Sequence, residues 1–358
     1  MYWFHMLHFI QNLLKNISPF TQLQVAFDLG THTTKIGLKG KGVVLREPTC
    51  AALRTQPTKE YIFFGSEAKQ IMGKTPEFLQ VIKPMVNGIV SDFDTEVALL
   101  RYYIEKSIVP YTRTLFIKPP IHAVTAVPTT ATEIEQKAVE EALLKSGCSS
   151  VTMIKKPLAT VAGAGFNVFF HKPHLVADIG AGLTEISVIS GGGIVSYRTL
   201  KQAGDFMDKV IANYVHLKHG IILGESTCEK LKIACLNFSD TEKTELVRGK
   251  SLENGLPKSV KIKSSELREA LTPTYTLIID TIKELLEISP PEIVNDIYQE
   301  GILLTGKAAL IPGFSSYIAD ELKIEVLVSE HASEATIYGL LKMADAPEHL
   351  KTVRINTA

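Results

Sequence analysis

The sequence predicts an α/β protein of two related lobes that face a single cleft. Its 358 residues allow two or more domains of ordinary size. A composition of 45% hydrophobic and 21% charged residues is that of a globular protein and excludes wholesale disorder. The most informative observation is an internal repeat, because residues 25–38 (VAFDLGTHTTKIGL) superimpose without a gap on residues 175–189 (LVADIGAGLTEISVI).

Charge and cysteine content exclude several functional classes. Lys plus Arg total 38, as do Asp plus Glu, so the formal net charge is zero and a phosphate-neutralising nucleic-acid groove is not expected. The four cysteines, at positions 50, 148, 228 and 235, lie outside any CxxC spacing. This spacing argues against a disulfide scaffold or a zinc site and fits a reducing cytosol. No uninterrupted apolar run is long enough for a membrane-spanning helix.

The first twenty residues predict an amphipathic helix that ends at Pro19. Its apolar face includes Trp3, Leu7, Ile10 and Leu14, while histidines, amides and one lysine form the other face. A signal peptide would need a basic leader and a small-residue cleavage site, which are absent. The helix either packs on its own protein or lies in the plane of a bilayer, and we favour the bilayer.

Each copy of the repeat predicts a strand, a tight Asp-x-Gly turn and a returning strand. The turn glycines let backbone N–H groups approach an anion, and threonine hydroxyls add donors for phosphate oxygens. These turn residues are Gly30, Thr31, Thr33 and Thr34 in the first copy, and Gly180, Gly182 and Thr184 in the second. Asp28 and Asp178 end equivalent strands and would repel a phosphate unless a cation such as Mg²⁺ intervened. One such turn is compatible with an ordinary hairpin; two in register favour a nucleotide cleft.

Further elements follow between the two copies. Residues 53–88 predict a small inserted subdomain with short strands and a helix near 67–72. A buried strand at 122–127 leads through a Pro-Thr-Thr turn into a helix from about Thr132 to Ser146, closed by Gly147. Glu135, in the first turn of that helix, either faces the ligand delivered by the strand or only interacts with the helix dipole.

After the second copy, Gly191–Gly193 predict a hairpin turn between two strands. Residues 204–262 begin with a helical pattern, continue with a second helix from near Glu225, and become more polar from about Ser239. The segment EGILLTGKAALIPGF predicts a strand, a glycine turn and the start of a helix. That geometry can place backbone against a purine, or it is a plain strand-to-helix loop.

These segments together resemble the MreB group of bacterial actins, within the actin, chaperone and sugar-kinase ATPase superfamily. The resemblance covers nearly the whole chain, and KGKGVVLREP and PPEIVNDI point to MreB within that superfamily. It implies an actin-like fold with a nucleotide cleft between two lobes, ATP or ADP with Mg²⁺, and a slow ATPase coupled to polymerisation. It also implies homopolymeric filaments on the cytoplasmic face of the inner membrane. There they would act with membrane proteins of the wall-synthesis machinery to maintain cell shape.

The resemblance also implies roles for particular residues. Glu135 matches the residue that positions the attacking water, and Asp28 and Asp178 would hold Mg²⁺ through water. The phosphate loops correspond to Asp28, Gly30, Thr31, His32 and Thr33, and to Asp178, Gly180, Ala181, Gly182 and Thr184. The ribose side, the base-flanking segment and the adenine-side turn correspond to Gly204 and Asp205, to Glu225, Glu229 and Lys232, and to Gly306 and Lys307. The helix at 1–19 resembles a membrane anchor, and Leu115 and Phe116 resemble a membrane-inserting loop.

The chain departs from the family at each glycine-rich turn. The usual DIGGGTTE carries Ala181 and Leu183 here, the usual DLGTANT carries His32 and Thr33, and the usual TGGGALL carries Lys307 and Ala308. Each change adds a side chain where the family leaves backbone bare. Lys307 could reach a phosphate or obstruct the base, so these changes leave the hydrolysis rate and nucleotide affinity open.

The predicted lobes are residues 20–163 with 326–358, and residues 164–325 with a small subdomain at about 204–262. A filament protein that binds nucleotide without hydrolysing it is the main alternative function. A small-molecule kinase of the same superfamily would need a further carboxylate as the base for its substrate hydroxyl, and we identify none. A chaperone ATPase would carry a peptide-binding β-domain, whereas only APEHLKTVRINTA follows the last strand–helix unit.

Overall fold

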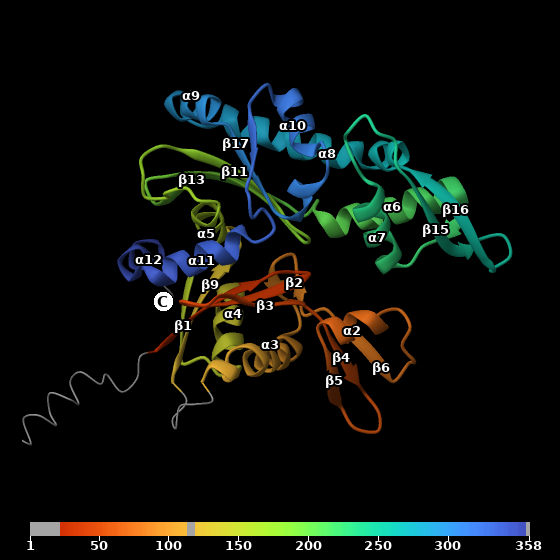
Figure 1. The fold of residues 1–358 in the computed structure, drawn as a ribbon, viewed down its shortest axis with the longest axis horizontal. Helices are drawn as coiled ribbons and strands as arrows, with labels where there is room; N and C mark the ends of the chain where they lie inside the picture. Colours follow the sequence, from red (N-terminus) through yellow and green to blue (C-terminus); the bar gives the residue numbers. More distant parts are fainter. Residues whose placement is uncertain (1–21, 113–118, 356–358) are drawn as a thin grey trace, which may run out of the picture.

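The computed structural model describes residues 22–112 and 119–355 (Figure 1). The predicted membrane helix at 1–19, with Trp3, Leu7, Ile10 and Leu14, and the predicted membrane loop with Leu115 and Phe116, lie outside these residues. Within the described ranges, no helix combines the length and the apolar character needed to cross a membrane.

The first large sheet has five strands in the order β10-β9-β1-β2-β3. Its strands are β1 (Leu23–Leu29), β2 (Thr33–Leu38), β3 (Gly42–Pro48), β9 (Ile121–Val127) and β10 (Ser150–Lys155). Alternate residues of β1 face opposite sides, as strand geometry requires. Val25 and Phe27 pack against α3 (Phe93–Ser107) and α4 (Glu133–Lys145), whereas Ala26 packs against α5 (Lys156–Gly163) and α11 (Ala335–Asp345).

The second large sheet repeats this topology with the order β13-β12-β11-β17-β18. Its strands are β11 (His174–Ile179), β12 (Thr184–Ser190), β13 (Gly193–Leu200), β17 (Ile302–Thr305) and β18 (Val326–Val328). In each sheet the first two strands form an antiparallel hairpin, and the first strand pairs in parallel with a later one. Both predicted strand–turn–strand units are therefore confirmed, as is the predicted turn at Gly191–Gly193 between β12 and β13.

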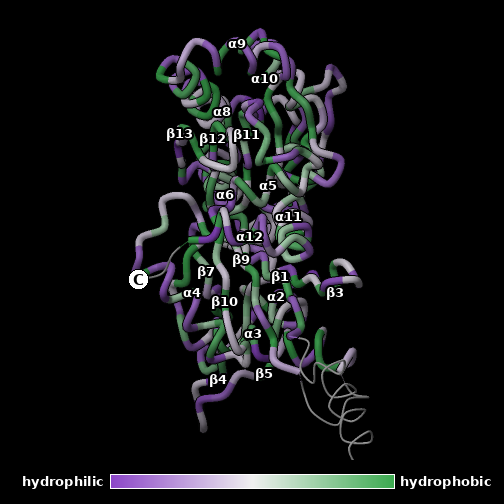
Figure 2. The backbone as a smooth tube through the Cα atoms, turned by 90° about the vertical axis from the view of Figure 1, so that its left-hand side faces the viewer, coloured by the Kyte–Doolittle hydropathy of each residue, from purple (hydrophilic) through white to green (hydrophobic). Residues whose placement is uncertain are grey.

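Helices α5 and α11 lie between the two sheets, and their backbones touch (Figures 1 and 2). A Cβ atom added to Gly163 would lie 1.6 Å from the carbonyl oxygen of Ala335, and one added to Gly339 would lie 1.7 Å from that of Ala159. This approach requires glycine at both positions. The close approach lets α11, near the end of the chain, pack on the first sheet. Residues far apart in the sequence thus share one hydrophobic core.

Two small sheets extend from the ends of the large ones. Strands β4 (Ala51–Arg54), β5 (Glu60–Phe64) and β6 (Leu79–Ile82) accompany α2 (Ser66–Ile71), which confirms the predicted helix near 67–72. On the other side, α6 (Gly204–His219) and α7 (Glu225–Cys235) confirm the two predicted helices, and the polar stretch that follows forms a hairpin of β15 (Thr244–Ser251) and β16 (Pro257–Lys263). The remaining elements of the described residues are β7 (Met85–Val86), β8 (Ile89–Val90), β14 (Ile221–Ile222), α8 (Ser264–Glu287), α9 (Pro291–Glu300), α10 (Phe314–Leu322) and α12 (Pro347–Val353), with the 3₁₀ turns η1 (Val109–Tyr111) and η2 (Lys307–Leu310).

Candidate functional site

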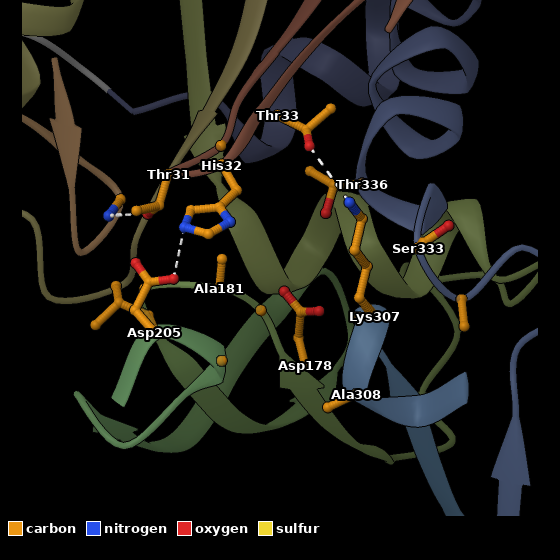
Figure 3. A pocket seen from close by; sticks show the side chains of 18 of the residues that line it. Thr31, His32, Thr33, Asp178, Ala181, Asp205, Lys307, Ala308, Ser333 and Thr336 are labelled. Carbon is orange, nitrogen blue, oxygen red and sulfur yellow. Dashed lines mark hydrogen bonds and ion pairs between the residues drawn. The ribbon is translucent and has the colours of Figure 1, made fainter. Parts of the chain in front are cut away.

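A cavity of about 390 Å³ lies where the turns of the two repeated hairpins meet. Its walls are the β1–β2 turn, the β11–β12 turn, the starts of α6 and η2, and one face of α7 (Figure 3). A cavity of this volume suits a nucleotide-sized ligand. The two hairpins thus bring the predicted phosphate loops to a single place.

The two turns lie against each other, with the Thr31 side chain next to Gly182. A Cβ atom added to Gly182 would lie 2.4 Å from Oγ1 of Thr31, so a larger residue at 182 would push the turns apart. The Thr31 hydroxyl oxygen also accepts a hydrogen bond from the Gly88 N–H at 3.0 Å. The Asp205 N–H donates to the Ala181 carbonyl at 2.8 Å, which joins the start of α6 to the second turn. The Thr31 side chain and backbone hydrogen bonds thus join the two turns and the start of α6 at the cavity.

The paired carboxylates at the strand ends each carry a lysine partner. Hairpin pairing places Lys35 opposite Asp28, and the Lys35 Nζ lies 2.7 Å from the Asp28 Oδ2. Lys156, at the start of α5, lies 2.7 Å from the Asp178 Oδ2. Both lysines line the cavity. Neither is among the predicted site residues, although the hairpin register could have identified Lys35.

Glu185 is a third cavity carboxyl outside the predicted set. It stands opposite Asp178 in the second hairpin and is 1% exposed. One of its oxygens accepts a hydrogen bond from the Thr129 N–H at 2.9 Å, and the other lies 3.7 Å from the Lys156 Nζ. Burial raises the pKa of Glu185 despite the nearby ammonium group. Burial opposes the charge of Lys156, but Asp178 and Glu185 outweigh it, so the pKa of Lys156 rises.

Lys307 extends from the glycine turn after β17 toward the first hairpin, where its ammonium group lies 3.4 Å from Oγ1 of Thr33 (Figure 3). The preceding Gly306 has a φ of 84°, and a Cβ atom there would lie 2.2 Å from the Ile179 carbonyl oxygen. The Lys307 side chain is exposed but stands in the cleft with protein on both sides. Partial desolvation, followed by the positive charge of Lys35, therefore lowers its pKa.

Several ion pairs cross the mouth of the cleft, and each joins a basic residue of the first half of the chain to an acidic residue of α6 or α7. His32 lies 2.7 Å from Asp205 and 3.7 Å from Glu229, in geometry that fits ion pairing (Figure 3). Lys69 of α2 lies 2.9 Å from Glu229, and Lys83 pairs with Glu225. Basic groups on the side of the first sheet thus face acidic groups of α6 and α7. The His32 interaction, with help from Lys69, holds the pKa of Glu229 well below its usual range.

Replacing His32 by alanine should weaken the fold in a pH-dependent way. Burial and the charge of Lys83 lower the pKa of His32, but Asp205 and Glu229 outweigh them and raise it above 6.5. The stabilisation by protonated His32 is therefore full below its unfolded pKa and is lost as pH rises through the higher folded pKa. We expect His32→Ala to lower the free energy of unfolding by about 1–2 kcal/mol at pH 6. The difference should largely disappear at pH 9, and urea unfolding at both pH values measures it. An equal difference at both would show that the imidazole contributes by packing alone.

Most of the predicted nucleotide residues line the cavity. These are Asp28, Gly30, Thr31, His32, Thr33, Asp178, Gly180, Ala181, Gly182, Gly204, Asp205, Glu229, Lys232, Gly306 and Lys307. Thr34, Thr184 and Glu225 do not line it, and the buried Thr34 hydroxyl lies 2.9 Å from the Thr49 hydroxyl. The Thr184 hydroxyl is turned toward the Gln202 carbonyl, to which it donates at 2.9 Å, and Glu225 lies at the cleft mouth, paired with Lys83.

Glu135 also lies outside the cavity lining. It is the third residue of α4, and its carboxylate accepts a hydrogen bond from the Thr132 N–H at 2.8 Å. The Thr132 hydroxyl in turn accepts from the Glu135 N–H at 3.3 Å, which completes a capping box. In these contacts Glu135 serves the helix terminus, although α4 begins close to the cavity residue Pro128.

The carboxylates of the cavity can bind a hard cation such as Mg²⁺ only together with a bound phosphate. Among the described residues, no three His, Cys, Asp or Glu side chains are grouped as metal ligands. Asp28 and Asp178 nevertheless present carboxylate oxygens to the cavity from both sides. Mg²⁺ favours a few carboxylates completed by water and phosphate oxygens, and the cavity can supply that arrangement only when a phosphate is bound.

The family model described as MreB/Mbl protein matches residues 22–352 of the chain. The cell shape-determining protein Mbl of Bacillus subtilis is 37% identical over 328 residues, which cover 91% of this chain and 97% of the relative. The crystal structure of MreB5 of Spiroplasma citri bound to ADP is similar, with a TM-score of 0.85, 29% identity and coverage of 93% of this chain and 98% of that one. A second structure of that protein is bound to AMPPNP. A MamK double helical filament, at 18% identity and a TM-score of 0.76, covers 91% of this chain and 99% of its own and shares the fold.

Proposed function

Because the chain belongs to the MreB/Mbl family and has its actin-like fold, we propose that it is an ATP-binding filament protein that maintains cell shape. The observation that carries the proposal is the pair of Asp-x-Gly hairpins, which meet around one cavity of nucleotide size. The binding of ADP and AMPPNP by a relative of the same fold supports a nucleotide as the ligand.

The nucleotide's phosphates lie between the two turns in this proposal. Backbone N–H groups near Gly30, Gly180 and Gly182, with the Thr31 and Thr33 hydroxyls, donate to phosphate oxygens. Gly204 and Asp205 bind the ribose side, while Glu229 and Lys232 of α7 and the Gly306 turn enclose the base. Two contacts fix the position of the Lys232 side chain, which donates to the Gly204 carbonyl at 2.7 Å and lies 2.9 Å from Asp208.

Asp28 and Asp178 would hold Mg²⁺ through water once the phosphates are bound, and the cation would supply positive charge to the phosphates. Glu135 orients the water that attacks the terminal phosphate. To do so, Glu135 must come nearer to the phosphates, because it lies outside the cavity lining in this structure. This requirement fits a slow ATPase that turns over only when polymerisation rearranges the cleft.

The alternative is a filament protein that binds nucleotide without hydrolysing it. Its supporting observation is that Glu135 lies outside the cavity lining, where it completes the capping box of α4. Sedimentation of the full chain with ATP, ADP or no nucleotide, combined with phosphate release, tests both functions. Pelleting with ATP and steady phosphate release supports the ATPase, and pelleting without release supports the alternative. If nucleotide changes neither quantity, both proposals are wrong.

The filaments are homopolymers at the cytoplasmic face of the inner membrane, where they contact membrane proteins of wall synthesis. Attachment is peripheral, through the amphipathic helix at 1–19 and the loop with Leu115 and Phe116. The proposed lobes, 20–163 with 326–358 and 164–325, move as units about the cleft.

Co-sedimentation with neutral liposomes should fall when residues 1–19 are deleted, because burial of apolar side chains drives the binding. Unchanged co-sedimentation would show that this helix is no anchor.

A further inference from the structure

Two lysine ammonium groups enter the cavity from opposite sides. Lys35 comes from strand β2 of the first hairpin, and Lys307 follows the glycine turn after β17. Their side chains arise 272 residues apart, so only the closed fold brings them to one cavity.

The ammonium group of Lys35 lies beside Asp28, one of the two carboxylates predicted to hold the metal ion. Its Nζ lies 2.7 Å from the Asp28 Oδ2, with the lysine and aspartate side chains only 12% and 11% exposed. At the equivalent position the second hairpin carries Glu185 instead of a lysine. The first phosphate loop therefore carries its own positive charge beside the carboxylate that would otherwise need a metal ion.

Lys307 is a cation with no carboxylate partner among the described residues. Its ammonium group lies 3.4 Å from the hydroxyl oxygen of Thr33, the first residue of the strand that carries Lys35 (Figure 3). Partial desolvation lowers the pKa of Lys307, and the positive charge of Lys35 lowers it further. An anion that enters between the two ammonium groups would relieve this repulsion and give Lys307 a charged partner.

We propose that Lys35 and Lys307 form a two-lysine clamp for the polyphosphate of a nucleoside triphosphate, and that the clamp supplies part of the charge otherwise supplied by a divalent metal. This inference rests on the proposed nucleotide function. Its consequence is that nucleotide binding persists when divalent cations are removed. Each ammonium group donates charge-assisted hydrogen bonds to phosphate oxygens, which are stronger than neutral ones.

The test is equilibrium binding of a fluorescent ATP analogue to the full chain, in Mg²⁺ and in EDTA. Wild type should bind in EDTA within about tenfold of its affinity in Mg²⁺. The double variant Lys35→Met/Lys307→Ala should lose about 10- to 100-fold in EDTA and much less in Mg²⁺. Lys39→Met is the matched control, because Lys39 lies just beyond β2, pairs with Asp345 at 3.5 Å and does not line the cavity.

Thermal melting checks that each variant folds, and Lys307→Ala alone keeps the test valid if Lys35→Met does not, since Lys307 is exposed. That single variant should still lose about tenfold in EDTA. If the ratio of affinities in Mg²⁺ and EDTA is the same in wild type and in the variants, the clamp is wrong while the nucleotide site stands. If wild type fails to bind the analogue even in Mg²⁺, the proposed function is wrong and the clamp falls with it.

Discussion

Asp178→Asn should reduce ATP affinity in Mg²⁺ by about tenfold, the lower end for losing a group that orients a metal's bound water and no more than the loss expected when the metal itself is removed. The substitution removes the charge that faces the cavity and keeps the size of the side chain. Its amide N–H can donate to the Thr305 hydroxyl, which lies 3.1 Å from the Asp178 Oδ1, so that the amide oxygen faces Lys156. Calorimetric titration of ATP in Mg²⁺ measures the loss, and affinity equal to wild type would place the metal elsewhere.

The choice of asparagine follows from the buried neighbourhood of Asp178. From the sequence alone, Asp178→Ala would be expected to leave the fold intact. The structure shows instead that Asp178 is the 2.7 Å partner of Lys156. Removing one member of a buried ion pair costs about 3–5 kcal/mol, so an alanine variant could lose ATP binding merely by unfolding. With asparagine, Lys156 keeps an amide oxygen beside it and the carboxyl of Glu185 at 3.7 Å.

Glu135→Gln should bind ATP with wild-type affinity and release phosphate about 10²- to 10⁴-fold more slowly, if the carboxylate orients the attacking water. Glutamine serves in a capping box as glutamate does, so the hydrogen bond from the Thr132 N–H survives. The variant therefore separates the catalytic role from the structural one. Phosphate release under single-turnover conditions measures the effect.

The matched control is Glu133→Gln, which removes a charge from the same first turn at an exposed position. It changes the interaction with the helix dipole by a similar amount and leaves the capping box in place. Its phosphate release should equal that of wild type. Should Glu135→Gln also release phosphate at the wild-type rate, Glu135 is only a helix cap and another group orients the attacking water.

The two hairpins are predictable because their signals are local. Alternation along β1 and β2 and the glycine in each turn lie within 14 residues at 25–38, and the same pattern recurs 150 residues later. Helix α4 is predictable for a similar reason, since Thr132 and Glu135 form its capping box and Gly147 follows its end. Side chains of such units, including Asp28 and Asp178, therefore fall in the cavity as expected.

Helix α8 and strand β15 are absent from the predicted elements because packing decides them. Pro273 lies inside the 24-residue helix α8, where proline normally interrupts a helix. Buried Leu271 and Tyr275 on either side hold the helix in the core of the second sheet. Strand β15 buries only Val247 and Ser251 of its eight residues. Its sequence therefore lacks the alternation of apolar and polar residues that predicts a strand.

The charged contacts of the cleft have no local signal. Lys69 and Glu229 are 160 residues apart, and Lys83 and Glu225 are 142 apart. Only the packing of the two sheets against α5 and α11 brings such pairs together. Lys35 is the exception, since the hairpin register alone sets it opposite Asp28.

The central claim is that the two repeated hairpins form one nucleotide site. A crystal structure of the full chain with AMPPNP and Mg²⁺ tests it most directly. We expect the triphosphate between the turns that carry Gly30 and Gly182, with the ammonium groups of Lys35 and Lys307 within hydrogen-bond distance of its oxygens. A nucleotide bound elsewhere, or a cavity free of nucleotide at saturating AMPPNP, would contradict the claim.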